Sequence, residues 1–245
     1  MITTIRTKLY RADFDEPLAN WNTSSKSPLP RFGNKYLGHK NQNGLFFLTD
    51  SLLAANDYGV RDSMELNSLG KGRQQYYLTK LDEQIELTII DFSSCKRLYE
   101  MLDLLYSINI DVLTRDFKVF SEMEDDKSYE DYKTIYESIK SETDLVKIEE
   151  LKKELLGILG GTKDSQLEPE LEVPIFGQRL SDFSNGKVFR DLVQSKHPNV
   201  DGYKWREGID GFSFGLLDSK KLSAVSKTVV LVNTMKYLIE NNLLG

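Results

Sequence analysis

Apolar and alternating stretches predict strands in both halves of the chain. In the first half they cover residues 8–11, 45–48, 75–81 and 86–92. In the second half they cover residues 170–176, 208–215 and 228–232. These segments are rich in aromatic and β-branched residues, as strands are. The last of them is apolar along most of its length, which predicts a buried strand.

Apolar residues at helical spacing predict the helices between and after these strands. One helix follows residue 51, a second includes Leu98 to Leu105 after a cap at Ser93 or Ser94, and others cover residues 186–193 and 235–244. Within residues 121–159, Tyr132, Ile135, Tyr136 and Ile139 recur at i, i+3, i+4 and i+7. We therefore expect two charged amphipathic helices there, ending at Gly160-Gly161.

The strand at residues 45–48 ends in a polar corner. Asn43-Gly44 predicts a turn before it. Thr49, Asp50 or Ser51 is expected to cap the following helix, because their oxygens accept its free N–H groups. Polar corners at strand ends are common positions for ligand-binding groups.

Two long polar stretches are predicted to be loops. Residues 15–43 are rich in Asn, Ser, Pro, Gly and Lys, and residues 62–75 include Gly70-Lys71-Gly72-Arg73. Long loops in compact domains are often functional. The second loop, with Tyr76 and Tyr77 behind it, has two interpretations: a flexible surface loop, or a contact with single-stranded nucleic acid.

The net charge of −6 is concentrated in one segment. Residues 121–154 carry 12 acidic and 6 basic side chains, which leaves 26 of each sign elsewhere. An almost neutral body argues against broad electrostatic binding to nucleic acid. The acidic helices are either a solvated surface or a docking surface for a basic partner.

Composition excludes several classes of protein. No run of 18 apolar residues predicts a membrane span, and no signal-peptide pattern opens the chain, so we expect a cytoplasmic protein. One cysteine, Cys95, cannot form an internal disulfide, and with two histidines it cannot build a Cys/His zinc site. The sequence also lacks the Rossmann and Walker phosphate loops and the Gly-x-Ser-x-Gly elbow.

The order of four motifs resembles the ADP-ribosyltransferase superfamily, including its RES-domain toxins. These motifs are Leu9-Tyr10-Arg11, Pro30-Arg31-Phe32, the segment from Gly44 to Ser51 with Tyr58 behind it, and Gly208-Ile209-Asp210-Gly211-Phe212 followed by the strand at 228–232. The resemblance implies an α+β fold of a single domain, residues 1–245. It is a split β-sandwich that holds NAD, with the charged helices at about 121–161 as an insertion.

The resemblance also implies the chemistry. NAD is the substrate and no metal is needed. Breaking the nicotinamide–ribose bond has an oxocarbenium-like transition state, as in glycoside hydrolysis. The enzyme positions the pyrophosphate and the ribose and places a carboxylate beside the ribose.

Five residues match the family's NAD-binding positions. Arg11 corresponds to the first-strand Arg or His, and a guanidinium suits phosphate oxygens. Arg31 corresponds to a second arginine of the RES pattern. Thr49 and Ser51 lie where the arginine-specific branch has its Ser-Thr-Ser corner, and Tyr58 lies where another branch stacks a tyrosine on nicotinamide.

Three glutamates are candidates for the catalytic carboxylate. Glu170 and Glu172 resemble a Glu-x-Glu motif, and Glu207 precedes the Gly-Ile-Asp-Gly-Phe turn. The sequence departs from the family at two other positions: Lys227 stands where some branches have a glutamate before the last strand, and Asn56 and Asp57 stand near the position of the RES-type acid.

The expected function is a mono-ADP-ribosyltransferase, a toxin or defence effector that modifies a protein or nucleic acid and is neutralised by an antitoxin or immunity protein. Two alternatives stay open. The first is a RES-like enzyme that depletes NAD by hydrolysis or phosphorolysis. The second is a catalytically inactive fold used for binding.

Overall fold

The chain forms one mixed sheet of eight strands and seven helices in the residues that a computed structural model describes. These residues are 1–13, 46–68, 74–112, 126–159, 187–206, 211–218 and 220–243. The expected α+β class is confirmed. The strands are β1 (Ile2–Thr7), β2 (Tyr10–Asp13), β3 (Phe46–Thr49), β4 (Gln75–Leu81), β5 (Ile85–Asp91), β6 (Gly202–Arg206), β7 (Phe212–Leu216) and β8 (Lys227–Asn233). The helices are α1 (Leu52–Ser68), α2 (Leu98–Ser107), α3 (Asp126–Ser141), α4 (Leu145–Leu159), α6 (Lys187–Lys196), α7 (Lys220–Ser223) and α8 (Thr234–Glu240).

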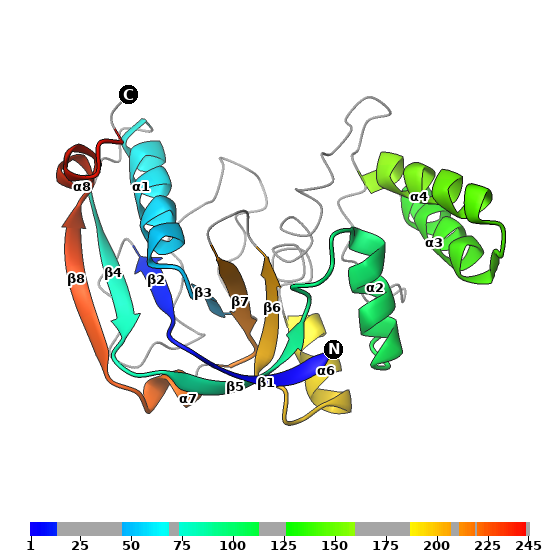
Figure 1. Cartoon of the computed structure of the whole chain (residues 1–245), viewed down its shortest axis with the longest axis horizontal. Coiled ribbons are helices and arrows are strands. Elements are labelled where there is room, and N and C mark those ends of the chain that lie inside the picture. The colour runs from blue at the N-terminus through cyan, green and yellow to red at the C-terminus, as the bar shows by residue number, and fades with distance from the viewer. Residues whose placement is uncertain are drawn as a thin grey trace.

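The sheet is strongly curled, with strand order β1-β5-β6-β7-β3-β2-β4-β8 (Figure 1). Two almost continuous chain segments explain the curl. β1 leads into β2, and β4 leads into β5, so each segment supplies one strand near each end of this order. β1 pairs with β5 and β2 pairs with β4, both antiparallel. The two segments can pair at both ends only if the sheet bends back on itself.

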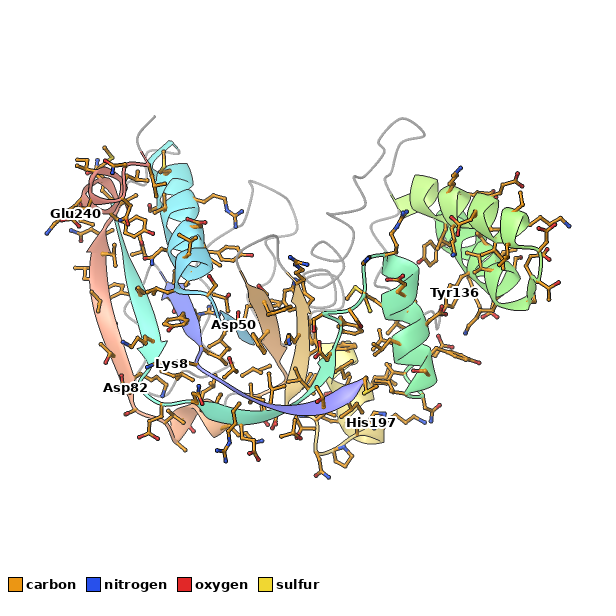
Figure 2. The ribbon with its side chains drawn as sticks, viewed as in Figure 1. Lys8, Asp50, Asp82, Tyr136, His197 and Glu240 are labelled. Atoms are coloured by element: carbon orange, nitrogen blue, oxygen red, sulfur yellow. The ribbon has the colours of Figure 1, made fainter. Side chains whose placement is uncertain are left out.

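Backbone and side-chain contacts hold the bend at which β1 passes into β2 and β4 passes into β5. The Leu81 N–H donates to the Leu9 carbonyl at 3.0 Å, and both leucine side chains are fully buried. Lys8 Nζ donates to the Asp82 carbonyl at 3.1 Å, and Thr228 Oγ1 donates to Asp82 Oδ1 at 2.6 Å (Figure 2). Hydrogen bonds from Thr228 and Ser226 lower the pKa of the Asp82 carboxyl. The bend is therefore fixed by both backbone and side-chain groups.

Three apolar clusters fill the space around the sheet. The largest packs α2, α3 and α6 against Ile90, Tyr203 and Trp205. The second packs Leu9, Leu81 and residues of β3, β5 and β7 with Leu222 of α7. The third joins Val60 of α1, Tyr76 of β4 and Leu238 of α8. Because side chains alternate along a strand, Phe47 reaches the first cluster and Leu48 reaches the second.

Several predicted boundaries are wrong for identifiable reasons. The first strand was expected at residues 8–11, whereas the chain forms β1 and β2 with Lys8 and Leu9 between them. Residues 62–68 were expected in a loop but continue α1, since Ser63 bonds across to Thr234 of α8 at 2.7 Å. The residue before α2 is Arg97, whose backbone N–H donates to Glu100 Oε2 at 3.2 Å, and not Ser93 or Ser94. β6 was not predicted at all. The strand expected at residues 170–176 lies outside the described residues.

The two charged helices predicted within 121–159 are present as α3 and α4 (Figure 1). Tyr132, Ile135 and Tyr136 are buried in the largest cluster, as their spacing predicted. Tyr136 donates its hydroxyl hydrogen to Asp103 of α2 at 3.0 Å. Burial, followed by the Asp103 charge and this bond, raises the pKa of Tyr136. The helix pair is therefore fixed to α2.

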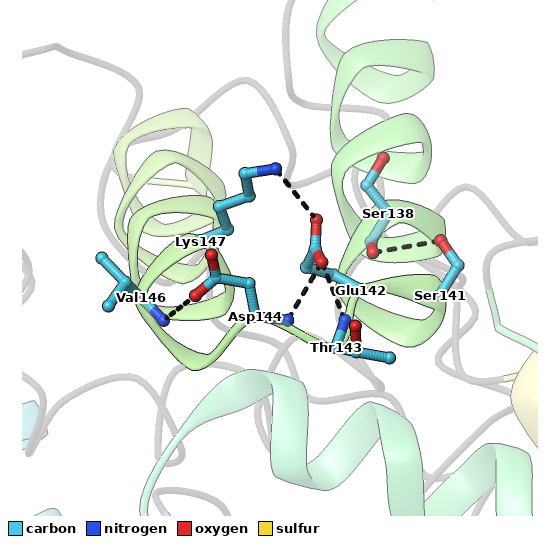
Figure 3. Close-up of polar contacts among 7 residues, drawn as sticks. All are labelled: Ser138, Ser141, Glu142, Thr143, Asp144, Val146 and Lys147. Carbon is cyan, nitrogen blue, oxygen red and sulfur yellow. Dashed lines mark hydrogen bonds and ion pairs between the residues drawn. The ribbon is translucent and has the colours of Figure 1, made fainter.

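A single carboxylate organises the turn between α3 and α4 (Figure 3). Glu142 Oε1 accepts the N–H groups of Thr143 at 2.8 Å and Asp144 at 3.0 Å, and Lys147 lies 3.9 Å from its other oxygen. The two backbone bonds lower the pKa of Glu142. Asp144 Oδ1 then accepts the Val146 N–H at 2.9 Å and caps α4.

The predicted burial of the strand at 228–232 is wrong. β8 is an edge strand that pairs only with β4 among the described strands. Val229, Val230 and Leu231 are 43%, 48% and 51% exposed. An apolar run alone does not indicate whether neighbours cover both faces of a strand.

We predict that Gly59→Ala destabilises the protein, although alanine in a helix is more favourable than glycine by about 1 kcal/mol. A Cβ at Gly59 would overlap Cδ2 of the buried Tyr76 ring. Overpacking of this kind costs about 1–3 kcal/mol. Urea denaturation measures the change, with exposed Met64→Ala in the same helix as control. A stability equal to or above that of the parent would contradict the packing of α1 on β4.

Candidate functional site

The polar corner expected after β3 lies where three strands meet. Thr49 pairs with Tyr10 of β2 on one side and with Ser213 of β7 on the other. Its hydroxyl accepts the Ser51 N–H at 3.1 Å, and Ser51 Oγ accepts the Ala54 N–H, also at 3.1 Å. Ser51 is thus the cap of α1, one of the three residues proposed for that role.

Asp50 ties this corner to the start of β7. Its Oδ1 accepts the Phe212 N–H at 2.8 Å, and its own N–H donates to the Phe212 carbonyl at 3.2 Å. Figure 2 shows Asp50 at the end of β3 near β7. Gly211 precedes Phe212 with a φ of +151°, and a Cβ there would lie 2.6 Å from Ser51 Cβ. Only glycine fits this approach without strain.

Arg11 occupies the point where β2 and β3 diverge. The register between these strands contains the single pair Tyr10–Thr49. Beyond it, Arg11 Nη1 donates to the Phe47 carbonyl at 2.8 Å, and Arg11 Nε bonds Asp13 Oδ1 at 2.7 Å. The Arg11 and Asp13 side chains are 23% and 20% exposed. Arg11 therefore braces the separation of the two strands with a partly shielded charge.

Two further polar groups lie next to Arg11. Thr79 of β4 pairs directly with Arg11, so both side chains project from the same face of the sheet. Thr79 Oγ1 and Asp13 Oδ2 are buried and have no hydrogen-bond partner among the described residues. Buried polar atoms without a partner are uncommon in folded proteins and call for an explanation. The sequence offers no pattern that would have singled out Thr79 or Asp13.

Tyr58 lies on α1, seven residues after the cap. Its ring is half-buried, and the Arg61 guanidinium carbon lies 4.7 Å from the ring centroid. Asn56, near the position of the RES-type acid, is buried and accepts the Tyr76 hydroxyl at 2.7 Å. Burial is the main cause of a raised pKa at Tyr76. Asn56 is thus committed to the interface between α1 and β4.

Four of the eight predicted site residues, Arg31, Glu170, Glu172 and Glu207, lie outside the described residues. Glu207 directly follows Arg206, the last residue of β6, which pairs with Phe212 beside Asp50. Of the other four, Thr49 and Ser51 share the corner. Arg11 follows Tyr10, the residue that pairs with Thr49, and Tyr58 lies two helical turns along α1.

Neither a metal cluster nor a membrane helix is found within the described ranges. No group of three or more His, Cys, Asp or Glu side chains there is placed to hold a metal ion. None of the helices there is long and apolar enough to cross a membrane.

Comparisons of this chain with models of known protein families, with curated proteins and with solved structures find no match.

We predict that Asp50→Ala lowers the free energy of unfolding by about 1–3 kcal/mol, because it leaves the Phe212 N–H without its acceptor. Asp50→Asn keeps an oxygen at the same position and is expected to retain most of the parent stability. Urea denaturation of both variants tests this. Equal losses in the two would show that the charge, and not the hydrogen bond, holds the corner.

We predict that Cys95 is unreactive in the folded protein. The thiol is buried, and burial raises its pKa from 9.0 to about 11. At pH 8 this leaves about a hundredfold less thiolate than an exposed cysteine has. A coloured disulfide reagent should react slowly with the native chain and rapidly in denaturant. The folded state holds the thiol proton more tightly than the unfolded state does. The contribution of this thiol to folding stability is therefore fully present below pH 9 and is lost as the pH rises towards 11. Rapid native labelling at pH 8 would contradict this.

Proposed function

We propose that the chain is an NAD-dependent mono-ADP-ribosyltransferase with a split β-sandwich of the ADP-ribosyltransferase type. One observation carries the proposal: the backbone of Arg11, of the Thr49–Ser51 corner and of the residue before Glu207 lies at neighbouring strand ends in the middle of the sheet. Tyr10 pairs with Thr49, and Asp50 and Arg206 both pair with Phe212. The resemblance requires an arginine, a hydroxyl corner and a carboxylate in one place.

The divergence of β2 from β3 also supports this fold. A sheet that separates after one residue pair can open into two halves. Opening at this point divides the strand order into β1-β5-β6-β7-β3 on one side and β2-β4-β8 on the other. An apolar cluster that includes Leu9, Leu81 and Phe214 would then lie between the halves.

Roles for the side chains follow from their chemistry. Arg11 retains a positive charge beside Asp13 and would orient the NAD pyrophosphate or ribose. Asp13 Oδ2 and Thr79 Oγ1 would supply hydrogen-bond partners for hydroxyl groups of the ribose. Glu207 would stabilise the oxocarbenium-like transition state and orient the acceptor, a role for which Glu170 and Glu172 are the alternatives.

The wider role follows the family. The acceptor would be a protein or nucleic acid in the cytoplasm, and a neutralising antitoxin or immunity protein would restrain the activity. NAD hydrolysis or phosphorolysis is the nearest alternative reaction, because it uses the same bond cleavage with water or phosphate as acceptor.

One observation favours a second candidate, a binding module without catalysis. Arg11, Thr49 and Ser51 each make hydrogen bonds that stabilise the fold. These bonds account for the three residues without any ligand.

We predict that the purified chain, incubated with NAD labelled in its adenylate moiety and cell lysate, transfers label to macromolecules. Label lost on nuclease treatment identifies a nucleic acid acceptor, and label lost on protease treatment identifies a protein. Free ADP-ribose without attached label would favour hydrolysis, and ADP-ribose 1″-phosphate would favour phosphorolysis. An absence of NAD consumption in every lysate would contradict both enzyme proposals and leave the binding module.

Matched variants test the residues. Arg11→Ala and Glu207→Gln should each lower transfer by about a hundredfold or more, the scale for loss of one transition-state contact. Arg6→Ala and Glu86→Gln are the controls, because this exposed pair lies on the same ladder away from the corner. Thermal melting separates lost chemistry from lost folding, since Arg11 also bonds Phe47. Full activity in Arg11→Ala would remove it from the site.

A further inference from the structure

The two edges of the sheet differ in how they meet solvent. β1 carries Thr3, Thr4 and Arg6, its two isoleucines pack into the apolar clusters, and Arg6 pairs with Glu86 at 3.3 Å. β8 has the sequence Lys-Thr-Val-Val-Leu-Val-Asn, with exposed valine and leucine at its centre. Long, regular apolar edges promote pairing with another chain, and proteins usually protect them with charges, proline or bulges. β8 lacks such protection along its centre.

The backbone hydrogen bonds show which residues of β8 face the open edge. The Thr234 N–H donates to the Gln74 carbonyl at 2.9 Å, and the Asp82 N–H donates to the Ser226 carbonyl at 3.0 Å. Residues with even numbers therefore direct their backbone groups towards β4. Since these directions alternate along a strand, the outward groups belong to Lys227, Val229, Leu231 and Asn233.

We propose that β8 pairs antiparallel with β8 of a second copy of this chain, about a two-fold axis at Val230. In this register Val229 lies opposite the partner's Leu231, and the two Val230 residues face each other. Residues opposite each other in this register then both have outward backbone groups or both have inward ones, as an antiparallel ladder requires. All seven residues of the strand take part.

The same register explains why the occupant is a second copy. Lys227 lies opposite the partner's Asn233, so no like charges meet across the junction. The exposed apolar residues at the centre cover one another, and apolar pairs stabilise cross-strand contacts. A strand that is complementary to its own reverse favours an isologous, two-fold interface.

The apolar surface continues beyond the strand onto α8, where Met235 and Ile239 are 41% and 61% exposed. In an antiparallel pair, the end of each β8 lies beside the start of the other. This places α8 next to the junction and enlarges the area that the second copy would cover. The inference does not depend on the proposed enzymatic activity.

Proline substitutions in β8 test the proposal, because the direction of the lost N–H decides whether the outer edge or the ladder to β4 is disturbed. Val229→Pro removes an N–H that faces the open edge and leaves the ladder to β4 intact. Thr4→Pro is the matched control at the other edge: the Asp91 N–H donates to the Met1 carbonyl, so the Thr4 N–H also faces outward. Leu231→Lys changes only a side chain and serves if the proline variant fails to fold.

Sedimentation and light scattering should give twice the 28.2 kDa chain mass for the parent and for Thr4→Pro. Val229→Pro and Leu231→Lys should give the mass of one chain, with parent-like circular dichroism. Val230→Pro, whose N–H faces β4, should instead lower the thermal midpoint. A monomeric parent at high protein concentration would overturn the proposal and leave the edge to a different protein. So would a dimer that survives both Val229→Pro and Leu231→Lys.

Discussion

The bend shared by β1–β2 and β4–β5 is the constraint on which the rest of the structure depends. Two chain segments pair along their whole length while crossing from one end of the sheet to the other. Leu9 and Leu81, fully buried and joined through the backbone, hold that crossing. A buried leucine replaced by alanine costs about 2–5 kcal/mol, so the bend is a strongly stabilised element. The curl of the sheet follows from it.

The divergence has a chemical consequence. Where β2 leaves β3, backbone groups lose their ladder partners, and a buried carbonyl requires another donor. Arg11 supplies one to Phe47 and forms an ion pair with Asp13. The same separation brings a positive charge, a carboxylate and the Thr79 hydroxyl together on one face. The guanidinium that satisfies the Phe47 carbonyl is thus also the charge on which the proposed NAD chemistry depends.

The corner after β3 depends on the bend less directly. Thr49, Asp50 and Ser51 end a strand, bind the start of β7 and begin α1 within three residues. Gly211 makes this junction close, because no side chain fits between it and Ser51. The sheet therefore has a tight polar junction in its middle, whereas its β8 edge is open and apolar.

The sequence by itself determined β4 with its bounds, the two charged helices and a cap of α1 among Thr49, Asp50 and Ser51, because periodicity and capping are local properties, and the motif resemblance implied the α+β class. Tyr132 and Tyr136 were predicted to share a buried face for the same reason. Tertiary structure alone decided that β8 is exposed, that residues 62–68 continue α1, and that β6 exists between β5 and β7. It also decided that Thr79 and Asp13 join Arg11. These facts depend on strand order and on which partners cover each face, and contacts between residues far apart in sequence leave no periodic pattern in the chain.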